Sequence, residues 1–187
     1  MKKVLIAMLL FVTTSATWAN PVPLTEIAKP GRILMLRHAY APGTGDPDNF
    51  KIGDCATQRN LDSTGREQAV QIGRRLAQAG VTKATVYSSQ WCRCLETARL
   101  LGLGPVNELP ALNSFFSIPE KRDSSISELR RFLAGLPANG PPVVLVTHQV
   151  TVTGLTGIYP SSGSGAILQL NGTCVPKIIG EVIFKNP

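Results

Sequence analysis

The sequence lacks the residue patterns that metal centres and nucleic-acid surfaces require. It contains only two histidines in 187 residues, and Cys92 and Cys94 are separated by a single residue, whereas paired zinc ligands usually have about two to four between them. We therefore expect no structural zinc. No run of Lys or Arg is interleaved with aromatic residues, so we expect no nucleic-acid partner. The sequence also lacks internal repeats and low-complexity tracts.

A long hydrophobic run is also missing, and the one apolar stretch near the start is short. Residues 1–19 begin with Lys2 and Lys3, continue through an apolar segment at residues 4–12 and end in small and polar residues at Ala19. This pattern predicts a secretory signal peptide cut after Ala19. The apolar segment is too short to favour the alternative of an uncleaved membrane anchor. The first cysteine, Cys55, lies far from the cut, so we expect no lipid anchor there.

Residues 20–187 have the length and composition of a single globular domain. The chain is 43% hydrophobic and has a formal net charge of +7, of which the leader contributes two lysines. A domain of this length can bury a substantial core. The modest positive excess that remains favours anionic ligands.

Export to an oxidising compartment would favour disulfide formation by the four cysteines. Besides Cys55, Cys92 and Cys94, the chain contains Cys174, and four cysteines allow three complete pairings. We expect a disulfide that joins Cys55 to Cys92 or to Cys94. Such a bond would tie the long Gly- and Pro-rich loop at residues 41–60 to the segment around Arg93.

Both histidines follow short apolar segments. Residues 33–36 precede Arg37 and His38, and the β-branched segment at residues 143–146 precedes Thr147 and His148. Each segment is typical of a buried strand. In α/β sheets the carboxyl ends of strands are where ligands bind. An Arg beside a His suits a phosphate centre, because guanidinium binds phosphoryl oxygens bidentately and imidazole can attack phosphorus.

A third apolar segment precedes Arg93. Residues 84–87 read as a strand and residues 91–101 as the helix that follows, so Arg93 is expected in a first helical turn, where anions are favoured. Periodicity predicts further helices at residues 63–79 and 126–133, and the small residues at 150–157 indicate the start of another helix. Alternating residues predict two closing strands at residues 165–170 and 178–184. We expect an extended arm at residues 20–30, a loop at residues 117–123, packing roles for Phe115 and Phe116, and a loop at residues 41–60 that lines the site.

Parallel strands would bring Arg37, His38, Arg93 and His148 around one hole of anion size. The alternative is that each is an unrelated polar group at a strand end. Four such placements in one chain favour the shared site.

These residues resemble the signature motifs of the histidine phosphatase superfamily, the small branch of the phosphoglycerate mutase-like group. Four motifs occur in family order: Leu36-Arg37-His38-Ala39, Leu61-Asp62-Ser63-Thr64-Gly65-Arg66-Glu67-Gln68-Ala69, Ser88-Ser89-Gln90-Trp91-Cys92-Arg93-Cys94-Leu95-Glu96-Thr97-Ala98 and Val146-Thr147-His148. The resemblance covers roughly residues 33–154.

The resemblance implies an α/β fold with a single three-layer α/β/α domain and a mostly parallel central sheet. It also implies that His38 is the nucleophile and forms a phosphohistidine, while Arg37, Arg93 and His148 bind the phosphoryl group. Water would then cleave the phosphohistidine. This arrangement requires no metal ion and no cofactor.

The sequence departs from the family pattern at two places. Ala39 replaces the glycine that follows the family's histidine, and residues 109–114 offer no carboxylate where many members supply a proton donor. Glu108 and Asp54 are the candidate proton donors, with Asp46 and Asp48 as further carboxylates of the long loop.

The sequence therefore predicts an exported, periplasmic phosphomonoesterase. We expect its substrate to be a phosphorylated small molecule or an envelope glycolipid phosphate. One alternative is a non-catalytic phosphate-binding or scaffold protein that retains the pocket. Another is a phosphotransfer protein that acts on phosphohistidine and needs a protein partner.

Overall fold

The computed structural model describes residues 21–184, and the predicted signal peptide at residues 1–19 lies outside them. A six-stranded sheet with the order β3-β2-β4-β1-β5-β6 organises this part of the chain. Four strands are mutually parallel: β1 (Arg32–Arg37), β2 (Thr85–Ser88), β3 (Val106–Glu108) and β4 (Val143–Thr147). The last two, β5 (Gly165–Gln169) and β6 (Lys177–Val182), form an antiparallel hairpin at one edge.

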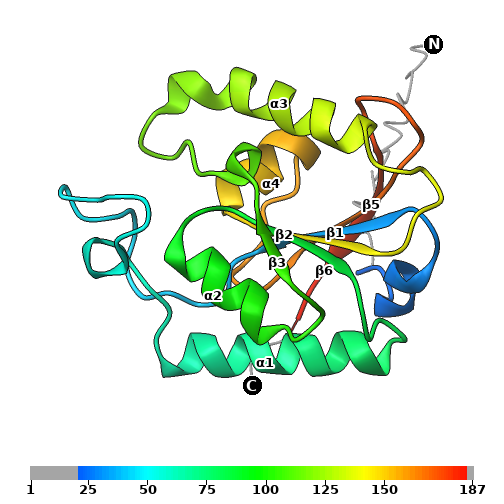
Figure 1. The fold of residues 1–187 in the computed structure, drawn as a ribbon, viewed down its shortest axis with the longest axis horizontal. Helices are drawn as coiled ribbons and strands as arrows, with labels where there is room; N and C mark the ends of the chain where they lie inside the picture. Colours follow the sequence, from blue (N-terminus) through cyan, green and yellow to red (C-terminus); the bar gives the residue numbers. More distant parts are fainter. Residues whose placement is uncertain (1–20, 185–187) are drawn as a thin grey trace, which may run out of the picture.

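Helices cover both faces of the sheet, so the predicted three-layer α/β/α arrangement is confirmed (Figure 1). The helices α1 (Ser63–Gln78) and α2 (Cys92–Leu100) lie on one face, and α3 (Arg122–Ala134) and α4 (Gln149–Thr156) lie on the other. Short 3-10 helices form at η1 (Leu24–Ala28), η2 (Cys55–Thr57), η3 (Pro110–Leu112) and η4 (Pro119–Lys121). Within residues 21–184, no helix combines the length and apolar character needed to cross a bilayer.

Alternation along the central strands divides the core into two layers. In β1, Leu34 and Leu36 pack toward α1 and α2, whereas Ile33 and Met35 pack toward α3 and α4. Successive strand side chains point to opposite faces, so both faces of a central strand must be apolar. This explains why the strand at residues 33–36 is an uninterrupted apolar segment.

The N-terminus of α1 is capped by a side chain. The side chain of Asp62 accepts a hydrogen bond from the backbone N–H of Gly65 at 2.8 Å, which satisfies one of the free donors of the first turn. Gly73 allows α1 to approach the end of α2, because a Cβ at this position would lie only 2.2 Å from the carbonyl oxygen of Leu101.

Two segments differ from their predictions. Residues 20–30 were expected to be an extended arm, but η1 forms there, with Ile27 buried and Glu26 paired with Arg32. Residues 117–123 were expected to be a loop, but they contain η4 and the start of α3 at Arg122. In both segments a proline at or before the first turn favours the start of a helix. These short helices have little apolar periodicity, so the sequence did not predict them.

The register of the sheet places the two histidines side by side. Arg37 pairs with Thr147 at the ends of the parallel strands β1 and β4. The backbone N–H of His38 donates to the carbonyl oxygen of Thr147 at 2.8 Å. His38 and His148 therefore leave the same edge of the sheet together.

Candidate active site

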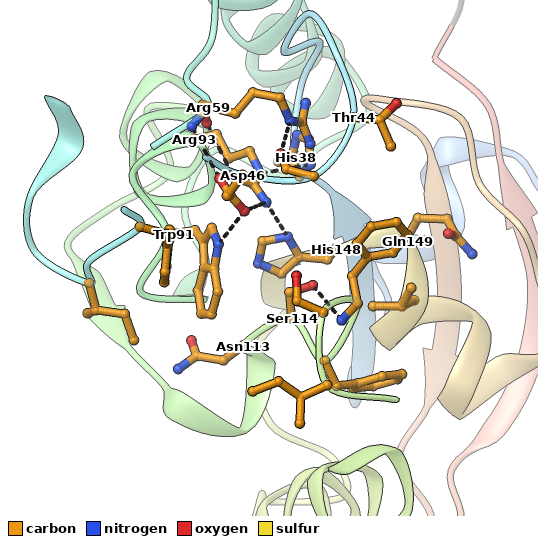
Figure 2. Close-up of a pocket in the computed structure, with 18 of the residues that line it drawn as sticks. His38, Thr44, Asp46, Arg59, Trp91, Arg93, Asn113, Ser114, His148 and Gln149 are labelled. Atoms are coloured by element: carbon orange, nitrogen blue, oxygen red, sulfur yellow. Dashed lines mark hydrogen bonds and ion pairs between the residues drawn. The ribbon is translucent and has the colours of Figure 1, made fainter. Parts of the chain in front are cut away.

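The two imidazoles lie at the floor of a cavity at the carboxyl edge of the sheet (Figure 2). The side chains of His38 and His148 are almost fully buried, and their ring centroids are 5.6 Å apart with an edge-to-face arrangement. His38 directly follows β1 and His148 directly follows β4, so the rigid sheet fixes the spacing of the two rings.

Hydrogen bonds define the tautomer of His38. Its Nδ1 lies 2.7 Å from the carbonyl oxygen of Ala39, which can only accept, so Nδ1 carries the proton. Its Nε2 accepts from Nε of Arg93 at 3.3 Å. Burial lowers the pKa of His38 well below its usual value, and the positive charges of Arg93, Arg59 and Arg37 lower it further. Nε2 is therefore an unprotonated, nucleophilic nitrogen.

The residue after His38 is Ala39, and its backbone needs no glycine at this position. Ala39 is fully buried, and its backbone N–H donates to Oγ1 of Thr97 at 3.0 Å. No residue other than glycine between positions 21 and 184 has a positive φ. Alanine at position 39 therefore introduces no backbone strain.

His148 is also held as a neutral imidazole, in the opposite tautomer. Its Nδ1 accepts from Nη2 of Arg93 at 3.5 Å, so the proton resides on Nε2, which lies 2.8 Å from Oγ of Ser89. Oγ of Ser89 in turn donates to Oδ1 of Asn113 at 3.2 Å. Burial lowers the pKa of His148 well below its usual value, with further lowering by His38 and Arg93.

Arg93 lies between the histidines and a carboxylate of the long loop. It occupies the first turn of α2, and its side chain is almost completely buried. Its Nη1 donates to Oδ1 of Asp46 at 2.6 Å and its Nη2 donates to Oδ2 at 3.1 Å. The bidentate pair fixes the plane of the guanidinium, while its Nε side faces His38.

Asp46 accepts two further hydrogen bonds, from Nε1 of Trp91 at 3.0 Å and from the backbone N–H of Arg59 at 3.1 Å. Burial acts to raise the pKa of Asp46, but the hydrogen bonds and charge of Arg93, together with these other donors, outweigh it. The pKa of Asp46 is lowered overall. Asp46 is therefore an ionised group that orients Arg93.

Arg37 lines the same cavity from the end of β1. Its Nη1 donates to the carbonyl oxygen of Pro160 at 3.0 Å, and its buried Nε has no hydrogen-bond partner among residues 21–184. Burial lowers the pKa of Arg37, but a guanidinium stays charged in proteins. The structure thus brings Arg37, His38, Arg93 and His148 together at one cavity, as their positions in the sequence predicted.

The long loop at residues 41–60 is bound to the start of α2 by several kinds of contact. A disulfide joins Cys55 to Cys92, one of the two pairings that were expected. Phe50 stacks on Trp91 with ring centroids 4.9 Å apart. The backbone N–H of Cys92 donates to Oε1 of Gln58 at 2.9 Å. The loop lines the cavity, as predicted, and it carries Asp46 to Arg93.

The two candidate proton donors lie away from the cavity lining. Glu108 is exposed and accepts from Nε2 of Gln90 at 3.2 Å, and Asp54 caps η2 through the backbone N–H of Ala56. Among residues 21–184, the carboxylates that line the cavity are Asp46 and Asp48. The described residues also contain no group of three or more His, Cys, Asp or Glu that could hold a metal ion.

The cavity has a volume of about 870 Å³ and a mixed lining. Its floor is formed by the arginines and histidines, whereas its mouth carries apolar side chains. Phe115 and Phe116 were both predicted to pack, and Phe115 is buried. The prediction is wrong for Phe116, which is half-exposed at the cavity. Each of the two adjacent aromatic residues has a serine on its other side, Ser114 or Ser117, so the sequence does not reveal which of them faces the solvent.

Several lining residues were not singled out from the sequence, namely Arg59, Trp91, Asn113 and Gln149 (Figure 2). Arg59 is the clearest case, because its backbone atoms bond to both Asp46 and Arg93. A signal existed for Trp91 alone, since it lies two residues before Arg93 in a matched motif. The others depend on how loops are folded over the sheet.

Comparison with known proteins gives one family match. Residues 33–117 match the model of the histidine phosphatase superfamily (branch 1). The search of curated proteins gave no match to the chain.

Solved structures share the fold at low sequence identity. One is the protein histidine phosphatase SixA complexed with tungstate, with a TM-score of 0.59 and 18% identity over 81% of this chain and 96% of that chain. Another is a putative phosphohistidine phosphatase SixA from Agrobacterium tumefaciens, with a TM-score of 0.56 and 18% identity over 83% and 99%. A phosphoserine phosphatase from Entamoeba histolytica, in complex with 3-phosphoglyceric acid, has a TM-score of 0.58 and 14% identity over 83% and 98%. These similarities confirm the predicted phosphoglycerate mutase-like fold.

Proposed function

We propose that this chain belongs to the histidine phosphatase superfamily (branch 1) and is an exported phosphomonoesterase that uses His38 as its nucleophile. The observation that carries the proposal is the state of the His38 ring. Its Nδ1 proton is held by Ala39, and its unprotonated Nε2 faces the cavity beside Arg93. A buried neutral imidazole surrounded by cations suits attack on a phosphate ester.

The reaction proceeds in two steps, transfer of the phosphoryl group to His38 and hydrolysis of the phosphohistidine. In the first, Nε2 of His38 forms a bond to phosphorus while the ester P–O bond breaks, and the leaving oxygen departs with the bonding electrons. In the second, water attacks the phosphohistidine, the P–N bond breaks and inorganic phosphate forms. Arg37 and Arg93 stabilise the charge on the transferring phosphoryl oxygens in both steps. His148 lies beside His38 at the floor of the cavity as a neutral ring that accepts a hydrogen bond from Arg93.

The periplasmic location is part of the proposal. The leader pattern of residues 1–19 supports it, and so does the Cys55–Cys92 disulfide, because such bonds persist in oxidising compartments. A phosphorylated small molecule or an envelope glycolipid phosphate would be the substrate available there.

The first experiment measures phosphate release from an aryl phosphate by the purified protein. We expect turnover, and we expect His38→Ala to retain less than about one per cent of it, because loss of a covalent step costs orders of magnitude. Circular dichroism of the variant checks its fold. Activity should survive EDTA and be inhibited by vanadate. Residual turnover well above this level in a folded variant would remove His38 from the nucleophile role.

A non-catalytic phosphate-binding role is the second candidate, and one observation favours it. The two carboxylates that line the cavity are Asp46, which is bound to Arg93, and Asp48, which is exposed. Asp46 is therefore not available as a proton donor. Binding of inorganic phosphate without release of phosphate from any ester would support this role over hydrolysis.

A further inference from the structure

Exposed apolar side chains are concentrated at the mouth of the active-site cavity. Four of the large apolar residues that are exposed within residues 21–184 line it: Ile52, Phe116, Ile118 and Tyr159, which are 40–73% exposed. The others are Tyr40, Val175, Ile178 and Ile183. Apolar groups that gather around a polar pocket mark a binding surface. The four come from three separate segments, so their meeting is a property of the fold.

The size of the cavity leaves room for a large organic group. A volume of about 870 Å³ is that of a site for a drug-sized ligand, since such sites span roughly 300–1,000 Å³. The phosphoryl group, bound at His38, would occupy only the floor. The rest of the ligand would lie against Ile52, Phe116 and Ile118.

The polar groups of the site limit the chemistry of the leaving group. Asp46 has both carboxylate oxygens engaged and a lowered pKa, and Asp48 is an exposed carboxylate. Without a carboxylic acid to protonate it, the leaving oxygen would depart as an anion. A phenol, with a pKa of about 10, leaves in this form far more readily than an aliphatic alcohol.

We propose that the substrates are phosphate monoesters of phenols, with the aromatic ring bound at the apolar mouth and the phosphoryl group at His38. The proposal rests on the function proposed above. In the first step the phenolate leaves as the P–N bond to His38 forms, and it takes its proton from solvent. The ring packs against the side chains of Phe116 and Ile118, and no acid from the protein is used.

Two esters of matched size test the leaving-group part. We expect phenyl phosphate to be cleaved at least about 100-fold faster than cyclohexyl phosphate, the low end of what general acid catalysis contributes. Equal rates for the two esters would overturn the proposal, because a proton donor would then be acting.

Two matched substitutions test the apolar mouth. Ile118→Ala should lower kcat/KM for phenyl phosphate about ten-fold, on the scale of removing methylene contacts in a pocket, and should leave acetyl phosphate nearly unaffected. Ile183→Ala is the control, since Ile183 has a similar exposure, 43%, and does not line the cavity. Equal effects of the two variants on phenyl phosphate would overturn the binding mode.

A binding measurement separates failure of this proposal from failure of the proposed function. Calorimetry with phenylphosphonate and methylphosphonate, which resist hydrolysis, should show tighter binding of the phenyl compound, with the difference reduced in Ile118→Ala. If no ester is cleaved but this preference holds, hydrolysis is wrong and the ligand class stands. If esters are cleaved but the two phosphonates bind equally, the ligand class is wrong and hydrolysis stands.

Discussion

The imidazole of His38 is prepared for attack by its neighbours on both sides. Ala39 fixes the proton on Nδ1, so Nε2 carries no proton and its lone pair accepts the hydrogen bond from Arg93. The same guanidinium bonds to Nδ1 of His148. One arginine thus sets the tautomer of both histidines, which makes its own orientation important.

The protonation of the histidines gives a direct prediction. Burial and nearby arginines lower the pKa of both rings, so neither should gain a proton between about pH 8 and pH 6, a range that includes the usual value of about 6.5. NMR of the untagged protein can follow them without assignment, because His38 and His148 are the only histidines in the chain. A ring that titrates near pH 6.5 would contradict the neutral nucleophile.

Asp46 is expected to act through Arg93. Asp46→Asn removes the charge that holds the guanidinium, and we expect kcat to fall about ten-fold, since a hydrogen bond to a charged group contributes about 1.5–3 kcal/mol. KM should not rise, because the variant also removes a negative charge that repels the substrate.

The control for this variant is Asp48→Asn, which changes a neighbouring, exposed carboxylate of the same cavity. We expect it to alter kcat less than about two-fold, as for other surface substitutions. A rise in KM with an unchanged kcat in Asp46→Asn would show that Asp46 does not position Arg93.

Among the elements, the loop at residues 41–60 and the start of α2 behave as one unit. Three consecutive residues, Trp91, Cys92 and Arg93, each contact the loop, through a ring stack, a disulfide and an ion pair. Ordering such a long loop costs conformational entropy, and the disulfide reduces that cost. The loop is therefore a wall of the site with a covalent anchor.

Loss of the anchor should reduce both stability and activity. Cys55→Ser opens a covalent loop with a sequence separation of 37 residues, and the chain-entropy model gives a loss of about 3–4 kcal/mol. Urea unfolding measures this loss, and phosphate release should fall with it because Asp46 is no longer held near Arg93. Cys174→Ser, which changes an exposed free thiol, is the control. Equal unfolding midpoints for the two variants would contradict the anchor.

For the molecule as a whole, the buried histidines couple stability to pH. Their pKa is lowered in the folded protein, while in the unfolded chain it is about 6.5. The unfolded state therefore binds more protons below about pH 6.5, and folding stability should decrease as the pH falls through this value. Urea midpoints at about pH 8, pH 6.5 and pH 5.5 test this. A midpoint that stays constant over this range would contradict the coupling.

Much of the architecture could be predicted from local patterns. The apolar segments that end at Arg37 and at Thr147 predicted two central strands, and the parallel register of β1 and β4 then brings His38 and His148 together. The helical spacing of Ile72 and Leu76 predicted α1, because the buried face of a helix requires apolar residues at intervals of about 3.6 residues.

The rest depends on contacts between segments that no local pattern records. Asp46 was one of several carboxylates in a long loop, and only the folded loop shows that it binds Arg93. Glu108 is near in sequence to the expected position of a proton donor, yet its side chain is exposed and bonded to Gln90. The exposure of Phe116 likewise follows from the shape of the cavity mouth.

The central claim is that a phosphoryl group is transferred to His38, and direct detection of that adduct tests it best. The protein is mixed with excess aryl phosphate, quenched in alkali within the first turnover, because phosphohistidine is labile in acid, and analysed by peptide mass spectrometry. We predict the added mass of one phosphoryl group on the peptide that contains His38, and none in vanadate-treated protein or in His38→Ala. Phosphate release without any such adduct, or an adduct on His148 in its place, would contradict the account.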